Sequence, residues 1–593
     1  MTPRRHEKEE DPRRWGLLAT FGACFFPGAL LGTQLAGLLF FLNPHLPFET
    51  VPVLRGAVFY GALLGYAGLP ILLMGCRGQQ SWSYRLLPAW LTAALSAGAA
   101  VFWVHAYYFG FFLPPGINRR LLKAAISLTV AALVCFYTIV LHRLRRRPYG
   151  ARSQILFAAM ALLSIYVVME RREAFRPSPE PSPRPTTITS TTRPQLAVVA
   201  VDAATLEAVL PLAEQGRLPF LASCLELGAH GRVEALVPVR ETALWTTVAT
   251  GLVPYRHGVV GEQRYESPFL GRESTAEDDL RIVPVGMAFE RWGTLGIGRL
   301  VGRKEMLALP MWEVLTHLGR STAAIGWPAT EPPSTSDAGF ILTDAFFKNT
   351  AVGRTADTSS PASQQLEQRA RLFATRPADL DPTVVARFGP RPDPTVLRYL
   401  SQDIWRRDLT FYLLEQEEVD VLFVHLPGLG VVSQQHYGGF EAVHFRGSTK
   451  PKSEDSARWV SAYYTDLDAF LARLWDSMED QRQLVLVSSH GVRGPEGLND
   501  LVRVVSRKPA RHGSWNDGPD GLLVLRGSGF RAGAALGQVH LVDLAPTLLY
   551  GQGLPVARDL DGVVLTQAFD PSFLARQPLS FVPSYETFVS PER

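Results

Sequence analysis

Residues 241–258 read ETALWTTVATGLVPYRHG, and this stretch decides how the second half of the chain is interpreted. A polar start at Glu241 leads into a predicted helix over residues 243–250, which Gly251 ends. Thr242 therefore lies at or next to a helix N-terminus, where unpaired backbone N–H groups and the helix dipole favour a phosphate or sulfate. Taken alone, a threonine in this place is more often an N-cap than a catalytic group.

A predicted buried strand precedes this helix by about forty residues. Residues 196–201 form the continuous apolar run LAVVAV, and Asp202 follows directly. Open α/β sheets place their ligands at the carboxyl ends of such strands. An aspartate after a strand is more often a turn or cap residue, but its pairing with Thr242 predicts a ligand site.

Four motifs together resemble a known family: Asp202, GRLPFL at 216–221, TALWTTVATG at 242–251 and the pair His257-Gly258. They resemble the type I phosphodiesterase/nucleotide pyrophosphatase branch of the alkaline phosphatase superfamily. The resemblance continues at 311–333 and 543–562 and covers roughly residues 196–565. It implies an alkaline-phosphatase-like α/β domain, with a largely parallel sheet and helices on both faces. It also implies that Asp202 is a metal ligand and Thr242 a metal-bound nucleophile.

Alternating apolar and amphipathic runs predict the same fold class. The predicted strands are 196–201, 322–326, 419–425, 484–487 and 521–525. Besides the helix at 243–250, the predicted helices are 203–215, 310–318, 394–417, 456–478 and 542–550. Residues 261–310 and much of 345–394 match nothing in the family and are expected to form cap or lid loops, where specificity usually lies.

The first part of the chain predicts a multi-span α-helical membrane region. Of the 593 residues, only 19% are charged and 47% are hydrophobic, too apolar for a wholly water-soluble protein. Five stretches are long enough to cross a bilayer. They are 15–42, 51–75, 86–113, 121–141 and 155–169. No span has a central acidic residue or charge pair, so an anchor or lipid-facing platform is favoured over a transport site.

The loop arginines predict the orientation of the spans. They cluster before the first span, between the second and third, and between the fourth and fifth: Arg4, Arg5, Arg13, Arg14, Arg77, Arg85, Arg143, Arg145, Arg146, Arg147 and Arg152. The N-terminus is then cytoplasmic, and everything after Met169 lies outside. Arg171, Arg172 and Arg176 run against this pattern. The prediction is a multi-pass protein of the cytoplasmic (inner) membrane with a periplasmic or extracellular domain.

The expected division of the chain follows from these patterns. Residues 176–194, RPSPEPSPRPTTITSTTRP, form an extended spacer that cannot bury a core. The expected parts are a cytoplasmic tail at 1–14, five transmembrane helices at 15–170, a linker at 171–195, the α/β domain at 196–570 and a C-terminal tail at 571–593. The four cysteines offer no disulfide framework or cysteine zinc site, and the net charge of +4 comes without a nucleic-acid-binding feature.

The resemblance implies two divalent metal ions, usually zinc. One would be bound by Asp202, Thr242 and His490, the other by His436 and a late ligand at Asp517 or His512. In such a centre one ion activates the nucleophile and the other stabilises phosphoryl charge. The chain departs from the pattern at two family carboxylates. Ser489 replaces the first, and Val432, or Gly430 with a two-residue insertion, replaces the second.

Three interpretations of the metal site follow from these departures. A single divalent ion is held by Asp202, Thr242 and His490. Alternatively, other ligands are recruited, from Asp517, His512 or His444. In the third, the domain is a catalytically inactive relative that binds a phosphorylated or glycan ligand.

The leading functional prediction is a membrane-anchored phosphoesterase. It hydrolyses phosphodiester or phosphomonoester bonds through a covalent phospho-Thr242 intermediate, on a phosphorylated small molecule, lipid or glycan. Five spans followed by such a domain is also the layout of phosphoethanolamine and phosphoglycerol transferases, which gives a transferase as one alternative. A pseudoenzyme that serves as an envelope binding module is the other, favoured by Ser489 and by Val432 or Gly430.

Overall fold

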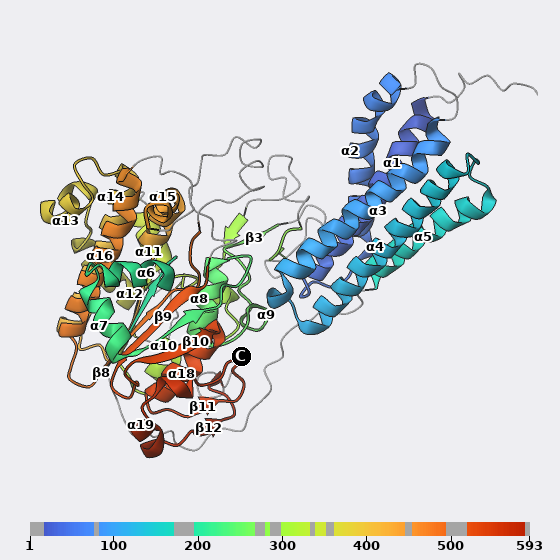
Figure 1. Ribbon diagram of the computed structural model, residues 1–593. Coiled ribbons are helices and arrows are strands. Elements are labelled where there is room, and N and C mark those ends of the chain that lie inside the picture. The colour runs from blue at the N-terminus through green and yellow to red at the C-terminus, as the bar shows by residue number, and fades with distance from the viewer. Residues whose placement is uncertain are drawn as a thin grey trace, which may run out of the picture. The chain divides into compact units, whose positions relative to one another are not determined.

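The computed structural model describes most of the chain, drawn in Figure 1. The described ranges are residues 17–75, 82–170, 195–266, 279–284, 298–332, 339–351, 361–444, 454–493 and 519–586. The predicted linker therefore lies outside the described residues. The chain forms two compact units: residues 1–178 with 263–300, and residues 179–262 with 301–593. We call them the membrane unit and the phosphodiesterase-like unit.

The membrane unit contains five helices that are long and apolar enough to cross a membrane, as the sequence predicts. They are α1 (Leu17–Leu42), α2 (Thr50–Gly75), α3 (Trp82–Tyr108), α4 (Pro115–Leu144) and α5 (Ala151–Met169). The fourth begins earlier than predicted because Pro115 is well suited to the first position of a helix. Small residues allow α1 and α2 to approach closely: a Cβ on Gly32 would lie 2.4 Å from the carbonyl oxygen of Gly56.

An eight-stranded sheet forms the centre of the second unit, in the order β10-β2-β9-β8-β1-β7-β5-β6. Its strands are β1 (Gln195–Val201), β2 (Ala229–Val233), β5 (Thr322–Trp327), β6 (Phe340–Thr343), β7 (Val421–Leu426), β8 (Arg482–Val487), β9 (Gly521–Gly527) and β10 (Ala534–Val539). Only β9 runs against the other strands of this sheet. The five predicted strands are confirmed, while β2, β6 and β10 lack the long apolar runs on which the prediction depends.

Helices cover both faces of this sheet (Figure 1). Ala197, Val199 and Val201 of β1 pack into a core with α6 (Leu206–Glu214), α7 (Pro219–Leu227), α14 (Pro394–Gln416), α15 (Gly428–His444) and α16 (Glu454–Asp476). The alternate residues of β1 face a second core with α8 (Glu241–Thr250), α10 (Met311–His317) and α18 (Leu544–Gly551). A strand buried on both faces explains why LAVVAV is apolar throughout.

Shorter elements complete the described chain. They are α9 (Pro254–His257), α11 (Asp344–Ala351), α12 (Pro361–Leu372), α13 (Pro382–Arg387), α19 (Pro571–Arg576), β3 (Gln263–Tyr265), β4 (Gly298–Leu300), β11 (Val556–Ala557) and β12 (Phe581–Val582). The fold continues past residue 570, where the sequence suggests a tail, because Phe573, Val582 and Tyr585 are buried in the second core.

A buried ion pair stabilises the loop before α10. Arg303 donates to both carboxylate oxygens of Glu313, at 2.8 and 2.7 Å, and the two side chains are only 9% and 4% exposed. Removing one partner of such a pair leaves a buried charge without compensation. We expect Glu313→Gln to lower the free energy of unfolding by about 3 kcal/mol. Thermal unfolding of the full chain in detergent checks this value.

The exposed pair Arg376–Asp379 gives the control. Its atoms are 2.8 Å apart, but the Arg376 side chain is 81% exposed. Exposed pairs contribute little because water and salt screen them. Arg376→Ala should therefore leave the melting temperature unchanged. Equal shifts for Glu313→Gln and Arg376→Ala would contradict the role given to burial.

Candidate active site

Three parallel strands end at the same edge of the sheet and bring the candidate residues together. Val201 of β1 pairs with Leu426 of β7, and Ala200 pairs with Val487 of β8. Asp202 follows β1, and His425 is the last residue but one of β7. Ser488, Ser489 and His490 follow β8. A carboxylate, two imidazoles and two hydroxyls therefore lie at the C-terminal edge of the sheet. This is the edge at which open α/β sheets bind their ligands.

Asp202 is the buried centre of this group. Its Oδ1 accepts hydrogen bonds from Trp245 Nε1 at 2.8 Å and from His425 Nε2 at 3.0 Å. Its Oδ2 accepts none from the residues that the structure describes. Burial raises the pKa of Asp202, but the charge and hydrogen bond of His425 outweigh this effect, so the pKa is lowered overall. Asp202 is therefore ionised and has one oxygen available to a ligand.

His425 is the charge partner of Asp202. Besides the bond to Asp202, its Nδ1 lies 3.3 Å from the carbonyl oxygen of Gly326. Both ring nitrogens therefore face oxygen atoms of neighbouring groups. The sequence interpretation missed His425. The sequence does contain a signal for it: His425 ends the apolar run VLFVH, as Asp202 follows the apolar run LAVVAV.

Thr242 is the second residue of α8, so it lies inside the first turn. The N-cap is Arg240, whose side chain makes no capping bond, so the N-cap interpretation of Thr242 is wrong. The Thr242 hydroxyl makes no hydrogen bond within the described parts of the chain, although the residue is 9% exposed. Trp245, three residues further along the same helix, bonds Asp202.

Glu241 adds an acid that the sequence interpretation did not assign. Burial raises its pKa well above the ordinary value, and the charges of Asp202 and Glu262 raise it further, against a smaller opposing effect of Lys348. Its Oε1 is buried without a hydrogen-bond partner among the described residues. A carboxyl whose pKa is raised keeps its proton to a higher pH than usual, which suits a proton donor.

His490 is fully buried beside this acid–histidine pair. Burial lowers its pKa to about 4, despite the attraction of Asp202. Its Nδ1 lies 3.0 Å from the hydroxyl of Ser489. The ring is therefore neutral at pH 7 and can accept a proton or bind a metal. Ser489 supplies a hydroxyl in place of the family carboxylate.

Among the other positions that the sequence considers for a metal, the structure describes the side-chain surroundings of His436, Val432 and Gly430. His436 on α15 packs edge-on against Trp459, with ring centroids 4.6 Å apart. Val432 is fully buried in the first core. Gly430 lies against Asp202, where a Cβ would come 2.5 Å from the Asp202 Cβ, so the chain leaves no room for a side chain there. His444 is the last residue of α15. His512 and Asp517 lie outside the described residues.

These placements do not fit a two-metal centre. Among the described residues, no group of three or more His, Cys, Asp and Glu side chains could hold a metal ion. Asp202 and His490 lie at this sheet edge, and Thr242 lies in the first turn of α8. A second ion would need a ligand at Val432 or Gly430, and neither residue has a side chain that can bind a metal.

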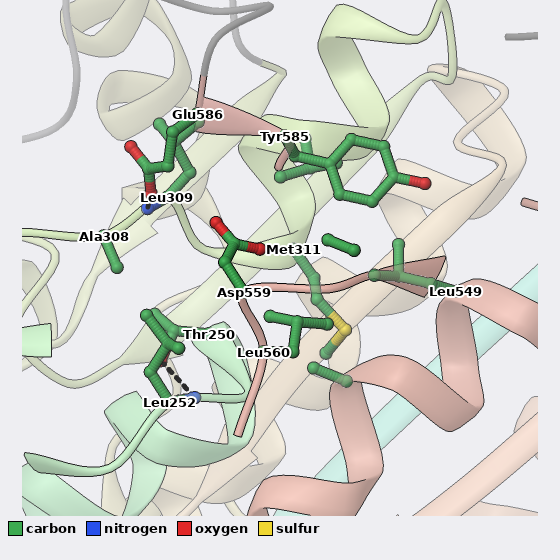
Figure 2. Close-up of a pocket in the computed structure, with 13 residues that line it drawn as sticks. Thr250, Leu252, Ala308, Leu309, Met311, Leu549, Asp559, Leu560, Tyr585 and Glu586 are labelled. Carbon is green, nitrogen blue, oxygen red and sulfur yellow. Dashed lines mark hydrogen bonds between the residues drawn. The ribbon is translucent and has the colours of Figure 1, made fainter. Parts of the chain in front are cut away.

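The pocket in Figure 2 belongs to another part of the domain. It lies beyond the C-terminal end of α8 and has a volume of about 30 Å³, room for little more than water. Its lining is mainly apolar, with Met311, Leu549 and Leu560 beside the carboxyls of Asp559 and Glu586. Glu586 accepts a bond from the Leu309 amide. None of the residues around Asp202 described above lines this cavity.

The sheet, its helices and the residues at its edge define an α/β domain of the alkaline phosphatase superfamily. The chain matches the model of the type I phosphodiesterase / nucleotide pyrophosphatase family over residues 196–512, and it belongs to this family. No curated protein matches the chain in sequence.

Several solved structures match part of the chain. Murine ectonucleotide pyrophosphatase / phosphodiesterase 5, as an inactive variant in complex with AMP, is 12% identical, with a TM-score of 0.37. The match covers 64% of this chain and 100% of that chain. The human protein of the same name is 10% identical, with a TM-score of 0.38, and the match covers 63% of this chain and 100% of that chain. A mutant of alkaline phosphatase PafA is 13% identical, with a TM-score of 0.38, and the match covers 64% of this chain and 100% of that chain.

Proposed function

We propose that the protein is a membrane-anchored phosphoesterase that cleaves phosphodiester or phosphomonoester bonds with Thr242 as the nucleophile. The observation that carries this proposal is the state of Thr242. Its hydroxyl caps no helix and has no partner among the described residues, yet it lies in the first turn of α8 beside Asp202. A hydroxyl at a helix N-terminus meets a phosphoryl group where backbone N–H groups stabilise its oxygens.

The surrounding residues supply the proton transfers that the reaction needs. The Thr242 oxygen attacks phosphorus, and the bond from phosphorus to the leaving oxygen breaks. Neutral His490 can accept the proton of the hydroxyl, and Glu241, whose pKa is raised, can donate to the leaving oxygen. Water then releases phosphate, or a phosphomonoester, from Thr242. If a divalent cation such as zinc were held by Asp202 Oδ2, Thr242 and His490, it would itself make the hydroxyl a stronger nucleophile, and His490 would serve as its ligand instead of as the proton acceptor.

The substrate class that we propose is a phosphorylated small molecule, lipid or glycan on the outer side of the cytoplasmic membrane. The family match supports a phosphoester, and the five apolar helices support a membrane location. The excess of arginines in three loops supports the orientation, with the N-terminus inside.

The test is to capture the covalent intermediate. Full-length protein in detergent is mixed with bis(para-nitrophenyl) phosphate and quenched in acid within one turnover. Peptide mass spectrometry should then find one phosphoryl or nitrophenylphosphoryl group on Thr242. Hydrolysis with a different modified residue, or none, would remove Thr242 from the nucleophile's role.

A specific observation favours a second candidate, a non-catalytic binding module. Trp245 and His425 already satisfy one oxygen of Asp202, and the second-metal positions are closed by Gly430 and Val432. This candidate expects no turnover with any divalent cation but measurable binding of a phosphate ester such as AMP. Turnover that depends on Thr242 rejects it.

A further inference from the structure

Residues 263–300 leave the phosphodiesterase-like unit and form part of the membrane unit. The described pieces of this insertion are 263–266, 279–284 and 298–300, which we call the docking arm. Strands β3 and β4 pair antiparallel at its base, and Tyr265 and Leu280 exchange two backbone hydrogen bonds of 3.0 and 2.8 Å. Arg299 forms an ion pair with Asp279 at 3.1 Å. The three pieces are therefore tied to one another.

Asn43, the residue after α1, binds the arm through its side chain. Its Oδ1 accepts from the backbone amides of Arg281 and Ile282, at 2.6 and 3.0 Å. Its Nδ2 donates to the carbonyl oxygens of Ile282, at 2.7 Å, and Leu39, at 2.9 Å. An Asn amide has two donor hydrogens and two acceptor lone pairs, and here all four are used. No other side chain of this size offers that combination.

Two further contacts strengthen this attachment. His45 Nε2 donates to the carbonyl oxygen of Asp279 at 3.1 Å. Leu280 is fully buried in an apolar cluster with residues of α1 and α2, among them Phe40 and Tyr60. Burying a leucine contributes roughly 1.5–3 kcal/mol, more than one surface hydrogen bond. The attachment thus combines apolar burial with a saturated amide.

The number of spans permits this contact. With five spans, the loop after α1 and the chain after α5 lie on the same side of the membrane, because α2–α5 cross it an even number of times. An insertion of the outer domain can then reach Asn43. Four or six spans would put Asn43 on the opposite side from the domain.

We propose that the loop after α1 is a receptor for the docking arm, with Asn43 as its latch. The contacts that carry this proposal all lie within the membrane unit: the four hydrogen bonds of Asn43, the bond from His45 and the burial of Leu280. The base of the arm is closed separately, since Val301, the first residue after the arm, donates to the Glu262 carbonyl at 2.9 Å.

Hydrogen exchange on the full chain in lipid nanodiscs tests the latch. In Asn43→Ala the amides of Arg281 and Ile282 lose their acceptor, and exchange in a peptide spanning 279–284 should accelerate about tenfold or more. Asn43→Asp keeps the shape but turns an oxygen toward two carbonyls, so it should accelerate exchange at least as much. Thr33→Ala, which removes only a bond within α1 to Ala29, should match the wild type. Unchanged exchange in both Asn43 variants would overturn the proposal.

Discussion

Thr242→Ala is expected to lower kcat/KM for phosphate ester hydrolysis by at least about 10³-fold, because it removes the attacking oxygen. The free energy of unfolding should change little, since this hydroxyl makes no hydrogen bond with any described residue. A structural role would give the opposite pattern, with lost stability and retained turnover. Initial rates with para-nitrophenyl phosphate and with its bis-ester, measured beside thermal unfolding of the same preparations, separate the two.

Two variants control this experiment. Thr242→Ser keeps a hydroxyl and should retain much of the activity. Thr383→Ala removes an exposed hydroxyl that bonds only Asp381 at the start of α13, and it should behave like the wild type. Activity in Thr242→Ala comparable to that of Thr383→Ala would mean that another group attacks phosphorus.

The parts of the site that the sequence predicts are those encoded locally. The run LAVVAV predicts a strand buried on both faces, and it therefore predicts that Asp202 lies at a sheet edge. Gly251 predicts the end of α8, and it adopts the left-handed conformation there, with φ of 69°. The start of α8 is two residues earlier than predicted, because Glu241 and Thr242 continue the helix instead of capping it.

The partners of Asp202 could not be predicted in the same way. Trp245 and His425 are 43 and 223 residues away along the chain, and only the order of strands brings them together. Neither residue type is unusual in its local context, since Trp245 reads as a core residue of α8. The charge state of the site therefore depends on topology rather than on any single motif.

The insertion at 263–300 illustrates a different limit. The sequence marks residues 261–310 as a loop that matches nothing in the family, and it suggests a lid. The described part of this loop instead binds Asn43, which lies 239 residues before Ile282. An asparagine after a helix predicts a helix end, but it does not predict a partner that far away.

The second large effect concerns acid stability and centres on His257, which is fully buried behind α8. Its Nδ1 accepts from the amide of Val259 at 3.2 Å, so this nitrogen carries no proton. Its Nε2 lies 3.0 Å from the hydroxyl of Thr247, which donates to the carbonyl of Ala243. Protonation of the neutral ring would put a hydrogen on Nδ1, where it would point at the N–H of Val259. Burial accordingly lowers the pKa of His257 to about 3.

The sign of the effect follows from this shift. The unfolded chain takes up a proton at His257 below about pH 6.5, while the folded chain does not do so until about pH 3. Stability is therefore lost as the pH falls through this window, by about 2 kcal/mol between pH 7 and pH 5 and by roughly 4 kcal/mol between pH 7 and pH 3. Urea unfolding of the full chain in detergent, followed by tryptophan fluorescence, measures the slope. His257→Gln should be less stable at pH 7 and have a smaller slope, the remainder coming in part from His490, whose pKa burial also lowers, whereas His317→Gln, at an exposed position of α10, should keep the full slope. A slope in His257→Gln equal to that of the wild type would assign the acid sensitivity to other groups.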